Sequence, residues 1–336
     1  MGDWHPALFS HWYAVARSRD VRKAPHAITV LDLPIVLARS DDGRVYALED
    51  RCPHRHAPLS AGCRTAQGIA CPYHGWTFGA DGAVQRIPGL PDDVALPAVR
   101  ARAFATHEHD GIVWLRPGDE GDAMPGAFVQ ALDPAHRRFL WRTTWDAHVV
   151  DAMENFMDPM HTHSIHAGLV RGGARAPATA TVRADGEGLS VEYSGQVAQS
   201  GLLYRLFESP RTSEHVHFAP PGSAQIAYRY RDGAIVRITL HFTPRNARQT
   251  DVVATLHVEN RWAPAWAVRW FVWPFLRRVG EQDRRMLAMQ ARNLERFPGR
   301  RGASTSLDVL RPFLEAFWLR GERPASAPAR SVPMML

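Results

Sequence analysis

The pattern of apolar and polar positions predicts two domains of different texture. Residues 27–48 alternate short β-branched and apolar runs with turn residues, as Asp41-Asp42-Gly43 illustrates. Short strands of this kind continue to residues 112–115, and a polar, turn-rich stretch over 117–122 then follows. This pattern predicts a small all-β domain over residues 8–122.

Longer elements are expected in the second half. Apolar positions spaced at helical intervals predict a helix over residues 148–161, and a long helical region is expected over 264–296. Several strand candidates lie between residues 189 and 259. The mixture predicts an α+β domain over 123–320, with helices packed on one side of a sheet. Residues 321–336 are rich in Pro, Ala, Arg and Ser, which predicts a disordered tail.

Composition narrows the classes of protein. The chain has 336 residues, of which 45% are hydrophobic and 22% charged, so two globular domains are expected. Only three cysteines are present, an odd and low count that argues for a reducing, cytoplasmic location. The N-terminus has no basic stretch before an apolar run, so no secretory signal is expected. The apolar stretch over 262–275 is short and is broken by two prolines and an arginine, which argues against a membrane span.

The net charge of +6 raises the question of an acidic partner. The basic residues are mostly scattered arginines, and the signatures of nucleic-acid binding are missing, so no nucleic-acid partner is expected. A basic face that docks an acidic protein would use the charge equally well.

Two short loops each combine one cysteine with one histidine. Cys52-Pro53-His54 is followed by Cys71-Pro72-Tyr73-His74. Two thiolates and two imidazoles suit either zinc or a Rieske cluster, in which two histidines replace two cysteines on one iron. Zinc pairs usually group like with like, so the mixed loops favour the cluster. Cys63 lies between the loops, and we expect it to be a small buried apolar residue.

A second set of polar residues follows in the later half. Asn155, Asp158, His161 and His166 occur within twelve residues of one another. Two histidines and a carboxylate that leave open positions are typical of iron(II) that must bind oxygen. Asp158 and His161 are three residues apart and would share one side of a helix, although Pro159 disturbs that turn. His163 is the alternative to His166 as a ligand.

Together these motifs resemble the Rieske non-heme iron oxygenases. The flanks Arg51-Cys52-Pro53-His54-Arg55 and Cys71-Pro72-Tyr73-His74-Gly75-Trp76 are similar to the Rieske domains of ring-hydroxylating and demethylating oxygenases, and Asn155-x2-Asp158-x2-His161-x4-His166 matches their catalytic motif. The resemblance implies a [2Fe-2S] cluster on Cys52, His54, Cys71 and His74. It also implies an N-terminal Rieske domain followed by a helix-grip-type catalytic domain with an antiparallel sheet and C-terminal helices.

The same resemblance assigns the iron site. It implies that His161, His166 and Asp283 hold a mononuclear Fe(II), with Asp158 and Asn155 as catalytic residues. Asp158 resembles the carboxylate that links a cluster histidine of a neighbouring subunit to an iron-ligating histidine. Asp283 is matched through the family offsets Asp283, Met286, Leu287 and Gln290. The family usually has an acid directly before this Asp, whereas this chain has Gln282, so Glu281 stays an alternative ligand.

The resemblance also implies the activity and its partners. A terminal oxygenase of this kind takes electrons from NAD(P)H through a reductase or ferredoxin and consumes O2. The resemblance also implies a head-to-tail homotrimer. In it, electrons would pass from His74 to Asp158 of the neighbouring subunit and then to His161. At 336 residues the chain resembles the vanillate demethylase-like and toluenesulfonate monooxygenase-like oxygenases. This resemblance favours hydroxylation or oxidative demethylation of an aromatic or polycyclic molecule, as a step of aromatic catabolism. Ring cis-dihydroxylation is one alternative, and a Rieske electron carrier without oxygen chemistry is the other.

The substrate pocket is less defined by the sequence. Trp266, Trp270 and Trp273 form a stripe at helical spacing, for which core packing is favoured over a lid or a membrane-surface contact. The apolar candidates for a hydrophobic pocket are Met153, Met157, Leu202, Phe207, Ile226 and Trp273.

Overall fold

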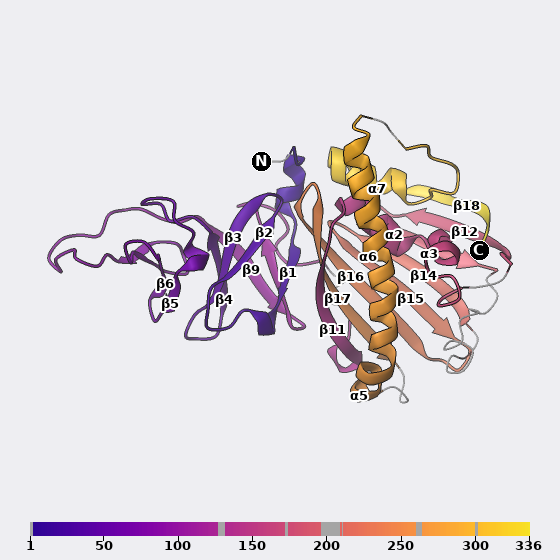
Figure 1. Ribbon diagram of the computed structural model, residues 1–336, viewed down its shortest axis with the longest axis horizontal. Helices are drawn as coiled ribbons and strands as arrows, with labels where there is room; N and C mark the ends of the chain where they lie inside the picture. Colours follow the sequence, from indigo (N-terminus) through magenta and orange to yellow (C-terminus); the bar gives the residue numbers. More distant parts are fainter. Residues whose placement is uncertain are drawn as a thin grey trace. The chain divides into compact units, whose positions relative to one another are not determined.

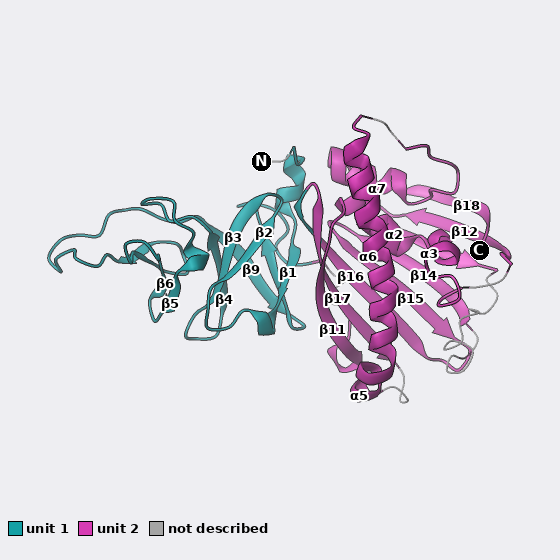
Figure 2. Ribbon diagram, viewed as in Figure 1, with its two compact units in different colours: residues 1–125, 243–246 teal, residues 126–242, 247–336 magenta. Residues whose placement is uncertain are grey.

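The chain divides into two compact units. The structure is a computed structural model that describes residues 3–126, 132–171, 174–195, 209, 211–259, 264–299 and 302–336. Unit 1 comprises Met1–Pro125 with Thr243–Asn246, and unit 2 comprises Gly126–Phe242 with Ala247–Leu336 (Figures 1 and 2).

Unit 1 is built from two antiparallel sheets. A six-stranded sheet has the order β1-β10-β9-β4-β3-β2, and a four-stranded sheet has the order β5-β6-β7-β8. Apolar side chains such as Val36, Leu48 and Phe78 form its buried core together with Cys52 and Cys71. The strands are β1 (Tyr13–Arg17), β2 (His26–Val30), β3 (Leu33–Arg39), β4 (Val45–Glu49), β5 (Cys63–Thr65), β6 (Gly68–Ala70), β7 (Thr77–Phe78), β8 (Val84–Arg86), β9 (Ala103–His109) and β10 (Ile112–Arg116), with short 3-10 turns η1 (Pro6–Ser10), η2 (Ser18–Asp20) and η3 (Leu59–Ala61).

A segment from far along the chain completes unit 1. Leu31 and Asp32, the two residues between β2 and β3, have positive φ angles of 51° and 63°. Such a turn points its N–H groups outward, and they donate to the carbonyls of Pro244 and Arg245 at 2.8 Å each. Thr243 Oγ1 also donates to the Ala14 carbonyl at 2.9 Å. Residues 243–246 therefore satisfy backbone groups that the β2–β3 turn leaves open.

Unit 2 is an eight-stranded antiparallel sheet with helices packed against it. The strand order is β11-β17-β16-β15-β14-β13-β12-β18, and α6 runs along the sheet (Figure 1). Burial alternates along β12 and β13, as expected where one face of a sheet lies on a core. The predicted α+β architecture, with an all-β domain before an antiparallel sheet and C-terminal helices, is confirmed.

The elements of unit 2 have the following bounds: β11 (Arg137–Trp145), α2 (Val149–Met157), α3 (Thr162–Ile165), β12 (Pro177–Ala184), β13 (Leu189–Ser194), β14 (Arg211–Ala219), β15 (Ser223–Tyr230), β16 (Ile235–Asn246), β17 (Gln249–Glu259), α5 (Ala265–Ala267), α6 (Trp273–Arg296), α7 (Arg311–Arg320) and β18 (Ala327–Met335), with short turns η4 (Pro134–His136), η5 (Pro159–His161) and η6 (Val268–Val272). None of the helices in the described part of the chain is long and apolar enough to cross a membrane.

A π-helical segment, η6, interrupts the long C-terminal helical region. A π turn contains more residues than an α turn, so it rotates the preceding residues out of phase with those that follow. Trp273 consequently stacks on Phe139, with ring centroids 4.4 Å apart, whereas Trp266 and Trp270 are 63% and 70% exposed. The expectation that all three tryptophans pack in the core is wrong for Trp266 and Trp270.

The predicted disordered tail over residues 321–336 is also wrong. Gly321 ends α7 in a left-handed conformation, and β18 pairs antiparallel with β12. Val332, Met334 and Leu336 alternate toward the buried side of the sheet, and Pro333 is tolerated because β18 is an edge strand. The burial of these three side chains offsets the entropy of ordering a segment whose composition suggested disorder.

Two neighbouring methionines test this strand. Met334 is 6% exposed and Met335 is 46% exposed. We expect Met334→Ala to lower the free energy of unfolding by about 2 kcal/mol, because it leaves a cavity under the sheet. Met335→Ala should change it by less than about 0.5 kcal/mol. Urea unfolding followed by fluorescence measures both values, and equal small effects would argue that the segment is unpaired in solution.

Candidate metal centres

The two Cys-His loops of unit 1 are built alike. In the first loop, the Cys52 carbonyl accepts from His56 N at 2.8 Å and Cys52 N donates to the Ala57 carbonyl at 2.8 Å. In the second loop, the Cys71 carbonyl accepts from Gly75 N at 3.1 Å and Cys71 N donates to the Trp76 carbonyl at 2.8 Å. His56 and Gly75, the fifth residue of each loop, both have positive φ, at 60° and 71°. The two loops thus share one backbone geometry, with the histidine as the third residue of the first loop and the fourth residue of the second.

The four side chains sort by type rather than by loop. Cys52 and Cys71 are both buried, and burial raises the pKa of the Cys52 thiol, with a further contribution from the neighbouring Cys71. The His54 and His74 rings lie with centroids 4.7 Å apart. Trp76 stacks on His54 at 4.6 Å with an interplanar angle of 11°, and His54 Nδ1 is buried without a hydrogen-bond partner. The two thiols face each other and the two imidazoles face each other.

This sorting distinguishes the two metal groups that the sequence allows. Four ligands on one tetrahedral zinc ion, with bonds of about 2.0–2.3 Å, would all lie within about 4 Å of one another. Among the described residues, the one group of at least three His, Cys, Asp or Glu donors within 4.8 Å of one another lies elsewhere, in unit 2. A thiol pair and an imidazole pair instead fit a cluster with sulfur ligands on one iron and nitrogen ligands on the other.

Cys63 belongs to neither loop. It begins β5 and is exposed. The expectation that it is buried is therefore wrong, because a three-residue strand at the rim of a small sheet leaves its first side chain in solvent.

In unit 2 the second motif begins on a helix that breaks early. Helix α2 ends at Met157, and Asp158 has extended backbone angles because a proline disfavours the helical conformation of the residue before it. Asp158 instead caps the turn η5, with Oδ1 accepting from Met160 N at 2.9 Å. The predicted helix over 148–161 is thus wrong beyond Met157, and Asp158 and His161 do not share one helical face.

The turn and α6 bring three metal-binding side chains together. His166 Nε2 lies 3.0 Å and His161 Nε2 lies 3.5 Å from Asp283 Oδ1, and the three donor atoms are all within 4.8 Å of one another. Bonds of about 2.1 Å to a first-row metal place adjacent ligands of an octahedral site about 3 Å apart. Asp283 Oδ1 is buried and makes no hydrogen bond. The donor set therefore fits a 2-His-1-carboxylate metal.

The alternative ligands have other surroundings. The Glu281 carboxylate accepts from Arg284 and Arg285, and the hydrogen bonds from these guanidinium groups lower its pKa to about 2. His163 does not belong to the three-donor group among the described residues. Glu281 does not reach the two histidines because it lies about 200° around α6 from Asp283.

The predicted catalytic residues, Asn155 and Asp158, lie on α2 and directly after it. Burial raises the pKa of Asp158 to about 6. Its carboxylate bonds the Met160 N–H, and the expected hydrogen bond to His161 is not seen among the described interactions. Asn155 Oδ1 is buried without a hydrogen-bond partner. The bridging role of Asp158 and the catalytic role of Asn155 stay predictions.

The sequence reasoning missed one contact of the site. The Gln282 Oε1 atom lies 3.0 Å from His166 Nδ1. The only signal in the sequence was that Gln282 stands where the family usually has an acid, and that departure gave no partner for the side chain.

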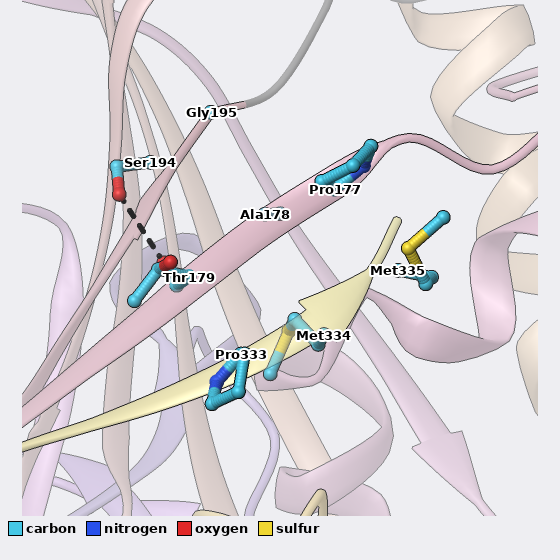
Figure 3. A pocket seen from close by; sticks show the side chains of 8 residues that line it. All are labelled: Pro177, Ala178, Thr179, Ser194, Gly195, Pro333, Met334 and Met335. Carbon is cyan, nitrogen blue, oxygen red and sulfur yellow. Dashed lines mark hydrogen bonds between the residues drawn. The ribbon is translucent and has the colours of Figure 1, made fainter.

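A pocket at the β18 edge of the sheet differs from the three-donor group in its side chains. It has a volume of about 450 Å³ and opens where β12, β13 and β18 meet (Figure 3). None of its lining residues carries a titratable side chain, so it lacks the imidazole and carboxylate donors of the His161, His166 and Asp283 group. These residues are Pro177, Ala178, Thr179, Ser194, Gly195, Pro333, Met334 and Met335.

The apolar candidates for a substrate pocket divide between core and undescribed positions. Met153 is fully buried and its Sδ accepts from Trp318 Nε1 at 3.3 Å, which joins α2 to α7. Trp273 is half-buried and stacks on Phe139. Leu202 and Phe207 lie outside the described residues.

Comparison with known proteins assigns both halves of the chain to domain families. Residues 11–100 match the Rieske [2Fe-2S] domain family, and residues 145–311 match the vanillate O-demethylase oxygenase C-terminal domain family. The chain is 38% identical over 159 residues to the oxygenase component of dicamba O-demethylase from Stenotrophomonas maltophilia, covering 46% of each chain. It is 36% identical over 160 residues to a putative toluene-4-sulfonate monooxygenase iron-sulfur subunit from Comamonas testosteroni, covering 46% of this chain and 45% of the relative. The matches span about half the length of these relatives.

The fold is similar to solved structures over nearly the whole chain. The crystal structure of dicamba monooxygenase bound to dicamba superposes with a TM-score of 0.75 at 22% identity, covering 92% of this chain and 95% of that one. The chain belongs to the Rieske non-heme iron oxygenases. Within them it is an α-subunit of the short type, as in vanillate O-demethylase and dicamba monooxygenase.

Two histidines three residues apart allow a matched test of the iron site. We expect His166→Ala to lose the mononuclear iron and keep the cluster, because it removes one of three ligands. His163→Ala should keep both. Iron per chain, measured after chelation of loosely bound metal, separates the variants. Iron loss in His163→Ala with retention in His166→Ala would transfer the ligand role to His163.

Proposed function

We propose that this protein is a terminal oxygenase that uses O2 and electrons from a reductase or ferredoxin to hydroxylate or oxidatively demethylate an aromatic or polycyclic small molecule. The observation that carries the proposal is the pairing of the matched Cys-His loops in unit 1 with the His161, His166 and Asp283 group in unit 2. A cluster with two imidazole ligands has a potential of about −150 to +300 mV, a range suited to accepting and passing on single electrons.

Each part of the chain has a task in this proposal. Cys52, His54, Cys71 and His74 would hold the cluster, and His161, His166 and Asp283 would hold Fe(II), which supplies the oxygen chemistry when bound. Two histidines and one carboxylate would leave positions on the metal open for O2. Asp158 would join His161 to His74 of a neighbouring subunit in a homotrimer, so that one working site uses two chains.

The relatives support demethylation or hydroxylation over ring dihydroxylation. Their names include a dicamba O-demethylase, a toluene-4-sulfonate monooxygenase and a methylxanthine N1-demethylase from Pseudomonas putida. The electron-carrier alternative has no use for three metal donors within 4.8 Å of one another, two of them buried. A small hydrophobic substrate and a protein electron donor complete the proposed set of partners.

Product mass tests the reaction type. Purified protein with a surrogate reductase, NADH and a panel of methoxylated, N-methylated and unsubstituted aromatic acids and heterocycles should consume O2 and NADH together. Under ¹⁸O2, hydroxylated products should gain one labelled oxygen, and demethylation should release formaldehyde. A cis-diol with two labelled oxygens would establish dihydroxylation instead, and reduction of the cluster without O2 consumption across the panel would favour the electron carrier.

A further inference from the structure

Gln282 contacts His166 at Nδ1, the ring nitrogen that does not face Asp283. His166 is 1% exposed, so its imidazole is buried and both ring nitrogens face protein atoms. Its Nε2 lies 3.0 Å from Asp283 Oδ1, and its Nδ1 lies 3.0 Å from Gln282 Oε1. Two consecutive residues of α6 thus reach the two nitrogens of one buried ring.

This arrangement decides where the proton of a neutral imidazole lies. An amide oxygen only accepts hydrogen bonds, so Nδ1 must donate to Gln282 Oε1. The lone pair then lies on Nε2, the atom that points to Asp283 and His161. A histidine that binds metal through Nε2 needs this tautomer and a fixed ring angle, and an acceptor at Nδ1 supplies both.

We propose that Gln282 is the positioning residue of the mononuclear iron site, which fixes His166 in its metal-binding tautomer through a neutral hydrogen-bond acceptor. The inference rests on the proposed function, because it requires a metal at the group of His161, His166 and Asp283. It also gives a meaning to the departure from the family pattern. An acid at position 282 would add a second negative charge beside Asp283, whereas the amide supplies the hydrogen-bond acceptor for His166 Nδ1 without that charge.

Neighbouring acids on α6 do not take over this task. The Glu281 carboxylate is held by Arg284 at 2.8 Å and by Arg285 at 3.0 Å. The role therefore depends on the side chain at position 282 itself, and it requires an acceptor atom rather than bulk.

Three variants separate an acceptor from mere packing. Gln282→Leu keeps a similar volume and removes the acceptor, Gln282→Glu keeps an acceptor, and Gln290→Leu makes the same change about two turns along α6. The cluster-loaded protein is titrated with Co²⁺ against a competing chelator, and the visible bands of bound Co²⁺ report the ligand field. Thermal unfolding and the cluster absorbance check that each variant is folded.

We expect Gln282→Leu to weaken Co²⁺ binding by about 10–100-fold and to change the Co²⁺ bands. Gln282→Glu and Gln290→Leu should stay within about threefold of the parent. Equal affinity of Gln282→Leu and parent would overturn the inference while leaving the proposed function intact, as would equal weakening in the Leu and Glu variants. A parent protein that binds no Co²⁺ at the three ligands would overturn both.

Discussion

Replacing Cys71 with serine is expected to remove the [2Fe-2S] cluster, and with it the visible absorbance and all reductase-driven turnover. Cys71 is buried beside Cys52, and its carbonyl and N–H are fixed by Gly75 and Trp76, so the protein places the Sγ atom with little freedom. A serine oxygen is a poor replacement for a thiolate on iron, which prefers soft ligands in such clusters. The measurements are iron and sulfide per chain and the EPR signal of the reduced protein.

Cys63 offers the matched control for this change. It is the one remaining cysteine of the chain, and it is exposed at the start of β5. Cys63→Ser should keep the cluster, its spectrum and the turnover of the parent. An unchanged spectrum in Cys71→Ser would rule out the assignment, and zinc in place of iron in the parent would restore the alternative that the mixed loops disfavour.

The second large effect is expected at Asp158. Asp158→Asn should lower reductase-driven turnover by about 100-fold or more while both metals stay bound. Asparagine caps a helical turn as well as aspartate does, so the bond to Met160 N and the position of His161 should survive. The change removes only the negative charge with which the carboxylate would receive hydrogen bonds from the two metal-bound histidines.

A bypass separates electron transfer from damage to the iron site. Hydrogen peroxide supplies oxygen and electrons together, so product formed with peroxide does not need the cluster of a neighbouring subunit. We expect Asp158→Asn to keep most of the peroxide-driven product. Loss of both activities would place Asp158 in the iron site itself, and retention of both would remove it from the mechanism.

Ligands that lie close together in the sequence are easier to predict than the side of a helix that faces a distant segment. The cysteine-histidine loops were visible because each is short, and His161 and His166 were visible because they share one segment. The choice between Glu281 and Asp283 depends on which side of α6 faces the turn after α2, and nothing in residues 281–283 states where that turn lies. The structure supplies it, since the ion pairs of Glu281 point one way and Asp283 points to the histidines.

Two errors have the same physical origin. The tryptophan spacing over residues 266–273 assumes an uninterrupted α-helix, and the π segment η6 breaks that assumption. The tail composition suggested disorder, yet the alternation of Val332, Met334 and Leu336 is the period of a strand. In both cases a feature of a few residues, the π segment or the alternating apolar side chains, decided the local structure.

Because residues 243–246 belong to unit 1, unit 1 cannot be exchanged between related proteins as one continuous segment. The carbonyls of Pro244 and Arg245 accept hydrogen bonds from the N–H groups of Leu31 and Asp32, so unit 1 includes the last four residues of β16, which follow it by more than a hundred residues in the sequence. A chimera joined at a single point near residue 125 would pair the β2–β3 turn of one protein with the end of β16 from another. Engineers who wish to graft a foreign electron-transfer module onto this oxygenase should therefore transplant two segments, the first 125 residues and residues 243–246 at the end of β16.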